Sequence, residues 1–129
     1  GGVVAAQDIM VSTFWEPHNE EIFVQVRDLG ATMAKKTGND YEIGKRLQEM
    51  HEEVGFSKVE GYFRQPQLSV AEAKKLYLVS IAEVADKAIK AGVLRSDTVE
   101  NWTSTMAAWP EDDPQPFHMA KSGYVLAWK

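Results

Sequence analysis

The pattern of apolar and polar positions predicts three strands and four helices along the 129-residue chain. The first apolar run is short and starts with β-branched residues, which is typical of a buried parallel strand. Helical periodicity then occurs twice, and an alternating strand, two more helices and a last strand follow. The elements are expected at Val3–Met10, Glu20–Lys36, Ile43–Val54, Ser57–Gln65, Ser69–Gly92, Ser96–Trp109 and Tyr124–Trp128.

Residues at the ends of these segments support their boundaries. Asn19 is expected to cap the first helix and Gly38 to end it. Gly55 is expected to end the second helix. Ser69 and Glu72 have the spacing of a capping box, which marks the start of the third helix.

The order of elements indicates an α/β fold with a small, three-stranded mixed sheet and about four helices. Ser122-Gly123 suggests a β-bulge before the last strand. The sequence contains no internal repeat and no interdomain linker, so residues 1–129 are expected to form one region. Because Val3–Ala6 is so apolar, we expect further strands on its N-terminal side, which would make the chain a truncated piece of a larger domain.

Composition then excludes several classes of function. Fourteen Lys and Arg against nineteen Asp and Glu give a net charge of -5, which argues against nucleic acid as a partner. The absence of cysteine excludes disulfides, thiolate metal sites and thiol nucleophiles, and it fits a cytoplasmic protein. No apolar run approaches the roughly 18 residues of a membrane helix, and no signal peptide is recognisable, so no membrane partner is expected.

Most catalytic motifs are missing from the sequence. It has no phosphate-binding P-loop, no GxSxG nucleophile elbow and no glycine-rich dinucleotide fingerprint. His51-Glu52 begins like the zinc motif HExxH, but Gly55 stands where the second histidine is required. No metal site is therefore expected.

The candidate site residues lie around the loop that follows the first strand. His18 is either a general base with a pKa near neutrality or an exposed loop histidine. Asp8 either accepts backbone hydrogen bonds or faces a site. Phe14 and Trp15 either line a substrate pocket or seal the edge of the sheet.

Several sequence features together resemble the C-terminal half of a class I S-adenosylmethionine-dependent methyltransferase. Gly1-Gly2 before Val3–Asp8 is similar to the turn and fifth strand of that family. The segment Ile43-Gly44-Lys45-Arg46-Leu47 through Gly55-Phe56 resembles its "IGxxLxxxxxxxGF" helix, and the strand Lys58–Phe63 follows it as in the family. The ending Gly123–Lys129 resembles the closing seventh strand.

The resemblance implies a Rossmann-like methyltransferase fold that lacks the N-terminal cofactor-binding strands. Its last strand would be inserted antiparallel between the other two. The chain would then be the substrate-recognition half of a transferase that acts on a small-molecule acceptor. The parent protein would use S-adenosylmethionine, whereas this chain is expected to bind no cofactor alone and to be inactive alone.

The resemblance also implies which residues contact the acceptor, and these residues are assigned from their positions relative to the family's elements. Besides His18 as the possible base, the acceptor would meet the residues that surround the loop after the fifth strand. They are Asp8, Phe14, Trp15, Tyr41 and Arg46.

A second function remains open, that of a non-catalytic α/β binding or dimerisation module. The apolar strand Val3–Ala6 would otherwise leave an unpaired edge in water. The partner is expected to be either the missing N-terminal half or a second copy of the chain, so the protein would be an oligomer in the second case.

Overall fold

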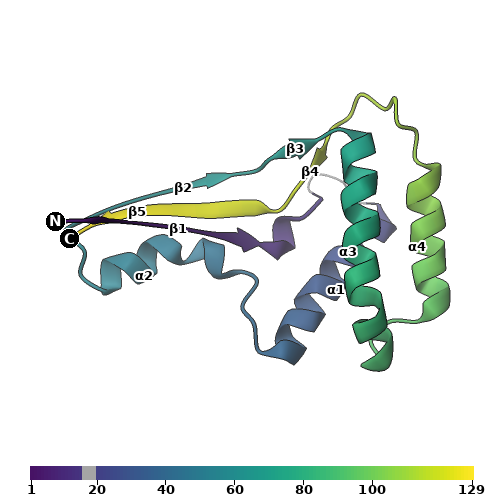
Figure 1. Cartoon of the computed structure of the whole chain (residues 1–129), viewed down its shortest axis with the longest axis horizontal. Helices are drawn as coiled ribbons and strands as arrows, with labels where there is room; N and C mark the ends of the chain where they lie inside the picture. Colours follow the sequence, from purple (N-terminus) through teal and green to yellow (C-terminus); the bar gives the residue numbers. More distant parts are fainter. Residues whose placement is uncertain (16–19) are drawn as a thin grey trace. The chain divides into compact units, whose positions relative to one another are not determined.

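The computed structural model describes residues 1–15 and 20–129 of the chain (Figure 1). Among these residues it is an α/β structure with four α-helices, two short 3-10 helices and five strands. The helices are α1 (Glu21–Thr37), α2 (Leu47–Glu53), α3 (Val70–Lys90) and α4 (Ser96–Ala108), with η1 (Val11–Thr13) and η2 (Ile43–Lys45). The strands are β1 (Val3–Met10), β2 (Lys58–Arg64), β3 (Gln67–Leu68), β4 (Phe117–His118) and β5 (Lys121–Trp128).

Contacts divide the chain into two compact units. The first unit comprises Gly1–Pro66 and His118–Lys129, and the second comprises Gln67–Phe117. The first unit contains the three-stranded sheet with α1, α2, η1 and η2. The candidate site residues that lie in the described part of the chain, Asp8, Phe14, Trp15, Tyr41 and Arg46, belong to this unit.

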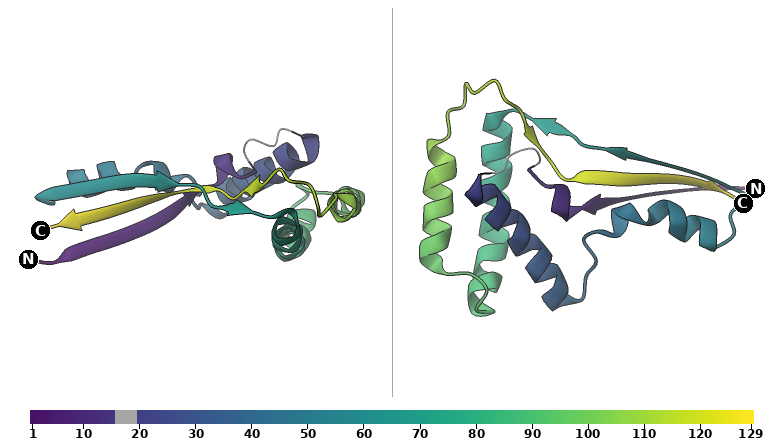
Figure 2. Two further views of the ribbon diagram at one scale, coloured as in Figure 1. Left: turned by 90° about the horizontal axis from the view of Figure 1, so that it is seen from above. Right: turned by 180° about the vertical axis from the view of Figure 1, so that it is seen from behind.

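The three-stranded sheet has the order β1-β5-β2, with β5 in the middle (Figures 1 and 2). β5 is antiparallel to both neighbours, as expected for a last strand inserted between the other two. β1 and β2 run in the same direction, but β5 separates them. Both pairings are therefore antiparallel, and the prediction of a mixed sheet is wrong in this respect.

The register assigns alternate residues to the two faces of this sheet. One face carries Gly123, Val125 and Ala127 of β5 with Gly61 of β2. A Cβ built on Gly61 would lie 2.5 Å from the side-chain oxygen of Gln48, so α2 lies against this face. Val125 and Ala127 are fully buried there.

The prediction that Val3–Met10 is a buried parallel strand is wrong. β1 is an edge strand that pairs only with β5, and most of its side chains are exposed. The exposed fraction is 57% for Val3 and 41% for Ile9, whereas Met10 is buried. The strand is exposed because its outer edge has no neighbour among the described residues and α2 contacts mainly β2 and β5.

The predicted helix Ile43–Val54 is divided into η2 and α2. The break falls at Arg46, whose φ and ψ of -111° and 0° are not helical. Gly44, two residues before this break, approaches the backbone of the sheet closely, since a Cβ on Gly44 would lie 2.5 Å from the carbonyl oxygen of Asp8. This close contact positions η2 against the sheet separately from α2.

The glycine in Ser122-Gly123 has a packing role and does not form the predicted bulge. Pairing between β1 and β5 is continuous from Met10–Lys121 to Val3–Trp128. A Cβ on Gly123 would collide with the carbonyl oxygen of Gly44. Glycine is therefore needed where η2 crosses β5.

Most predicted helix ends are confirmed. Gly38 ends α1 in the left-handed conformation with φ of 71°, and the capping box of Ser69 and Glu72 opens α3. Glu20 occupies the N-cap position of α1, and Asn19, the expected cap, lies outside the described residues.

The second unit is built on α3 and α4, which pack against each other. Their buried residues recur at helical spacing, as in Ala73, Tyr77 and Ile81 of α3 and Trp102 and Met106 of α4. β3 and β4 form a separate two-stranded sheet. In the described part of the chain, no helix combines the length and apolarity needed to cross a bilayer.

Candidate functional site

The candidate site lies where β1 ends and η1 begins. The N–H of Val11, the first residue of η1, donates to the carbonyl oxygen of Tyr41 at 2.9 Å. This bond brings the turn formed by residues 40–46 against the end of β1. Two segments that are thirty residues apart in sequence therefore meet at the end of the strand.

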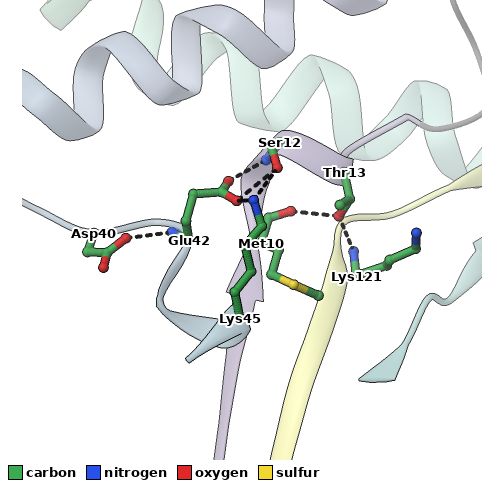
Figure 3. Close-up of polar contacts among 7 residues, drawn as sticks. All are labelled: Met10, Ser12, Thr13, Asp40, Glu42, Lys45 and Lys121. Atoms are coloured by element: carbon green, nitrogen blue, oxygen red, sulfur yellow. Dashed lines mark hydrogen bonds and ion pairs between the residues drawn. The ribbon is translucent and has the colours of Figure 1, made fainter. Parts of the chain in front are cut away.

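Glu42 is the centre of a hydrogen-bond network at this position (Figure 3). One of its carboxylate oxygens accepts the backbone N–H of Ser12 at 2.5 Å, and the other accepts the Ser12 hydroxyl at 2.8 Å. Lys45 Nζ lies 2.5 Å from this second oxygen and also donates to Ser12 Oγ at 3.2 Å. The main chain and the side chain of Ser12 are thus both fixed.

The network keeps Glu42 in its charged form. Burial opposes the charge, but the hydrogen bonds from Lys45 and Ser12 outweigh it and hold the pKa of Glu42 below its usual value. A carboxylate with a lowered pKa that already accepts three hydrogen bonds is a poor proton acceptor. Glu42 therefore orients Ser12 without activating it as a nucleophile, and the network positions η1.

Asp40 stabilises the turn from the other side. Its Oδ1 accepts the N–H of Glu42 at 2.9 Å, and its Oδ2 accepts a hydrogen bond from Arg46 at 2.5 Å. The Glu42 N–H and then the Arg46 guanidinium lower the pKa of Asp40. The carboxylate of Asp40 therefore remains charged and paired within the turn.

Thr13 connects η1 to the start of β5 through a hydrogen bond. Its hydroxyl donates to the carbonyl oxygen of Met10 at 2.6 Å and accepts the N–H of Lys121 at 2.7 Å (Figure 3). The side-chain amide of Gln65, just after β2, donates to the carbonyl oxygens of Thr13 and Met119 at 3.2 and 3.0 Å. Contacts from the ends of all three strands converge on η1.

Among the residues predicted for the site, Asp8 has a local hydrogen bond. Its Oδ1 accepts the N–H of the next residue, Ile9, at 2.8 Å, and its side chain is exposed on the edge strand. This contact agrees with the first alternative for Asp8, a carboxylate that accepts a backbone hydrogen bond.

Phe14 and Trp15 follow η1 directly and pack on each other. Their ring centroids are 4.3 Å apart in an edge-to-face arrangement, and Trp15 lies 5.8 Å from Phe23 of α1. Trp15 is 1% exposed and has a φ of 64°, a conformation that costs energy for a bulky residue. Its N–H donates to the carbonyl oxygen of His118 at 3.0 Å. Packing and this bond hold the strained residue in place.

Tyr41 and Arg46 lie in the turn that contacts η1, so the structure brings them to the same end of β1 as Phe14. Tyr41 is 38% exposed, and Arg46 is exposed and paired with Asp40. His18, the predicted base, lies outside the described residues.

The residues that organise this site do not stand out in the sequence pattern, and they are Ser12, Thr13, Glu42, Lys45 and Gln65. A Ser-Thr pair directly after a strand indicates a turn with bonds between side chains and backbone. It does not identify the acceptor, because Glu42 is distant in sequence and no local pattern distinguishes it from the other carboxylates of the chain.

The described residues contain no group of three or more His, Cys, Asp or Glu side chains that could hold a metal ion. No protein-family model matches this chain, and no curated protein matches it.

Proposed function

We propose that this chain is the substrate-recognition half of a class I S-adenosylmethionine-dependent methyltransferase that acts on a small molecule. The arrangement of the sheet supports this function best. The resemblance implies a last strand inserted antiparallel between two strands of common direction, and the order β1-β5-β2 has this form. The helix α2, which forms the middle of the family-like "IGxxL…GF" segment, covers one face of these strands.

The chain's own residues do not fit the cofactor. The resemblance equates β1 with the family's fifth strand, so the glycine-rich loop that follows the family's first strand has no counterpart in this sequence, which also has no dinucleotide fingerprint. The proposal therefore assigns the cofactor-binding strands to polypeptide outside this chain, in the cytoplasm, and expects this chain alone to be inactive.

In this proposal, the chain binds and orients the acceptor. Phe14 and Trp15, in the loop after β1, would contact the acceptor. Tyr41 and Arg46, in the turn of residues 40–46, would also contact it. Asp8 would border the site, and His18 would take the proton that the acceptor loses. The Glu42 network would fix the loop, since positioning of reactants supplies much of the rate of such transfers.

Isothermal titration calorimetry with S-adenosylhomocysteine tests this function. Circular dichroism first establishes that the sample is folded. We expect no binding heat from the folded chain. Binding at micromolar affinity would show that the chain builds a cofactor site of its own, and it would contradict the assignment to a substrate-recognition half.

A second candidate function is a non-catalytic binding or dimerisation module. The observation that favours it is the exposed edge of β1, where Val3 and Val4 are 57% and 42% exposed. Unprotected apolar edges of this kind pair with other chains. Sedimentation equilibrium tests the dimer, which should become more populated with concentration. A monomer at all concentrations would contradict self-association.

A further inference from the structure

The three-stranded sheet has one face that α2 and η2 do not cover, here called the open face. The register places on this face the residues that alternate with the buried set of Gly123, Val125 and Ala127. The apolar members are Val3, Ala5 and Ile9 of β1 and Tyr124, Leu126 and Trp128 of β5.

The exposure of these residues shows that the open face is accessible. Val3 and Ile9 are more than two-fifths exposed, and Leu126 and Trp128 are partly exposed even though β5 is the central strand. A central strand normally buries both faces when helices cover the sheet on both sides. The apolar side chains of the β1 and β5 rows are therefore accessible together, with Gln7 between them in the β1 row and Ser122, which is 6% exposed, at the end of the β5 row.

The third row of the open face, on β2, is polar and carries positive charge. Lys58 lies over the Trp128 ring at 4.8 Å and pairs with Glu60 at 2.7 Å. Arg64 lies 5.5 Å from the ring centre of Tyr62, and no carboxylate of the described residues forms an ion pair with it. The margin formed by β2 thus has an excess cation although the whole chain has a net charge of -5.

We infer that the open face binds an amphipathic helix that has an apolar stripe and an acidic flank. The stripe would lie on the β1 and β5 rows, and the acidic flank would face Arg64. This inference deepens the second candidate function by stating the chemistry of the partner, and it does not depend on methyl transfer.

The dimensions of the open face fit a single helix. β1 and β5 are eight residues long and β2 is seven, so three strands about 4.8 Å apart with a rise of about 3.3 Å per residue give a footprint of roughly 14 by 26 Å. It matches one helix about 10 Å wide and about 17 residues long.

Fluorescence anisotropy with labelled synthetic peptides tests the inference. The first peptide is a helix of about 18 residues with a leucine stripe and a glutamate flank. One comparison peptide has the same composition in scrambled order, and the other has lysine in place of the glutamates. We expect the chain to bind the scrambled peptide at least about tenfold more weakly and the lysine peptide about three- to tenfold more weakly.

Variants of the chain locate the binding surface. Leu126→Lys, in the middle of the open face, should abolish binding, and Val3→Lys, at an exposed edge position, should weaken it without affecting folding. Arg64→Glu should reverse the preference between the acidic and the basic peptide. Val54→Lys is the matched control, because Val54 is 76% exposed at the end of α2 and away from the open face.

Three binding results would overturn the inference. They are equal binding of all three peptides, absence of binding to a folded wild-type chain, and loss of binding in Val54→Lys but not in Val3→Lys. A wild-type dimer that Leu126→Lys converts to a monomer would identify a second copy as the occupant and would also overturn it. None of these results bears on cofactor binding, so the methyltransferase proposal is judged separately by calorimetry.

Discussion

Glu42 joins two segments that are distant in sequence, and its carboxylate accepts three hydrogen bonds at the end of β1. Bonds to a charged acceptor are stronger than bonds between neutral groups, and Glu42 is sheltered enough for them to contribute to stability. Its side chain is 32% exposed, so solvent reduces this contribution without removing it.

Replacing Glu42 by Gln should lower the free energy of unfolding by about 1 kcal/mol at neutral pH, because the amide offers a single oxygen and no charge. Urea denaturation followed by circular dichroism measures the change. Glu49→Gln, which alters an exposed carboxylate in α2, is the control and should change stability by less than about 0.5 kcal/mol. An equal effect of both substitutions would contradict the role given to the network.

The same carboxylate should make stability depend on pH. The pKa of Glu42 is lowered from 4.5 in the folded chain, so the unfolded chain takes up a proton first as the pH falls. The stabilisation is fully present above the unfolded pKa and is lost as the pH falls through the lowered folded pKa. Denaturation curves from about pH 6 to pH 3 should therefore show a smaller decrease in stability for Glu42→Gln than for the wild type.

Gly123 is the second residue on which the site depends, because the backbone of Gly44 occupies the space of its missing side chain. Gly123→Ala should destabilise the chain by about 3 kcal/mol or more, since the clash is with main-chain atoms that cannot rotate away. Gly2→Ala is the matched control, because a Cβ there meets no atom within 4 Å. Thermal denaturation of both variants checks this, and a stable Gly123→Ala would show that η2 does not cross β5 closely.

At the scale of elements, patterns within one segment were sufficient for α1, α3, α4 and β2, whereas the predicted helix Ile43–Val54 is divided into η2 and α2. The capping box, the glycine at the end of α1 and the alternation in β2 are all local signals. Whether Val3–Met10 is buried depends on neighbouring elements, and the sequence pattern of this segment does not contain them. An apolar run therefore predicts a strand correctly but does not show whether another strand or helix covers it.

The capping box of α3 provides a test at this scale. Ser69→Ala should lower stability by about 1 kcal/mol, because the N–H of Glu72 loses its acceptor and the Glu72 carboxylate loses the serine hydroxyl. Ser104→Ala, in the exposed part of α4, is the control and should have an effect below about 0.5 kcal/mol. Equal unfolding midpoints for Ser69→Ala and the wild type would show that the box does not stabilise α3.

At the scale of the whole molecule, the sequence led to a correct strand order but not to the organising contacts of the site. The order followed from a resemblance spread over the chain, whereas the bonds of Ser12, Thr13 and Glu42 depend on how the turn of residues 40–46 meets η1. Isolated polar residues carry no information about such distant partners. The open face and the unpaired edge of β1 likewise appear only when the sheet is assembled.

Amide hydrogen exchange followed by nuclear magnetic resonance tests whether β5 is the middle strand of the sheet and β1 its edge, because a middle strand bonds on both sides and an edge strand on one. We predict slow exchange throughout Ser122–Ala127 and protection of only alternate amides along Val4–Ile9. Uniform protection of every β1 amide in a monomeric sample would place a neighbour on its outer edge and would contradict both the strand order and the open edge.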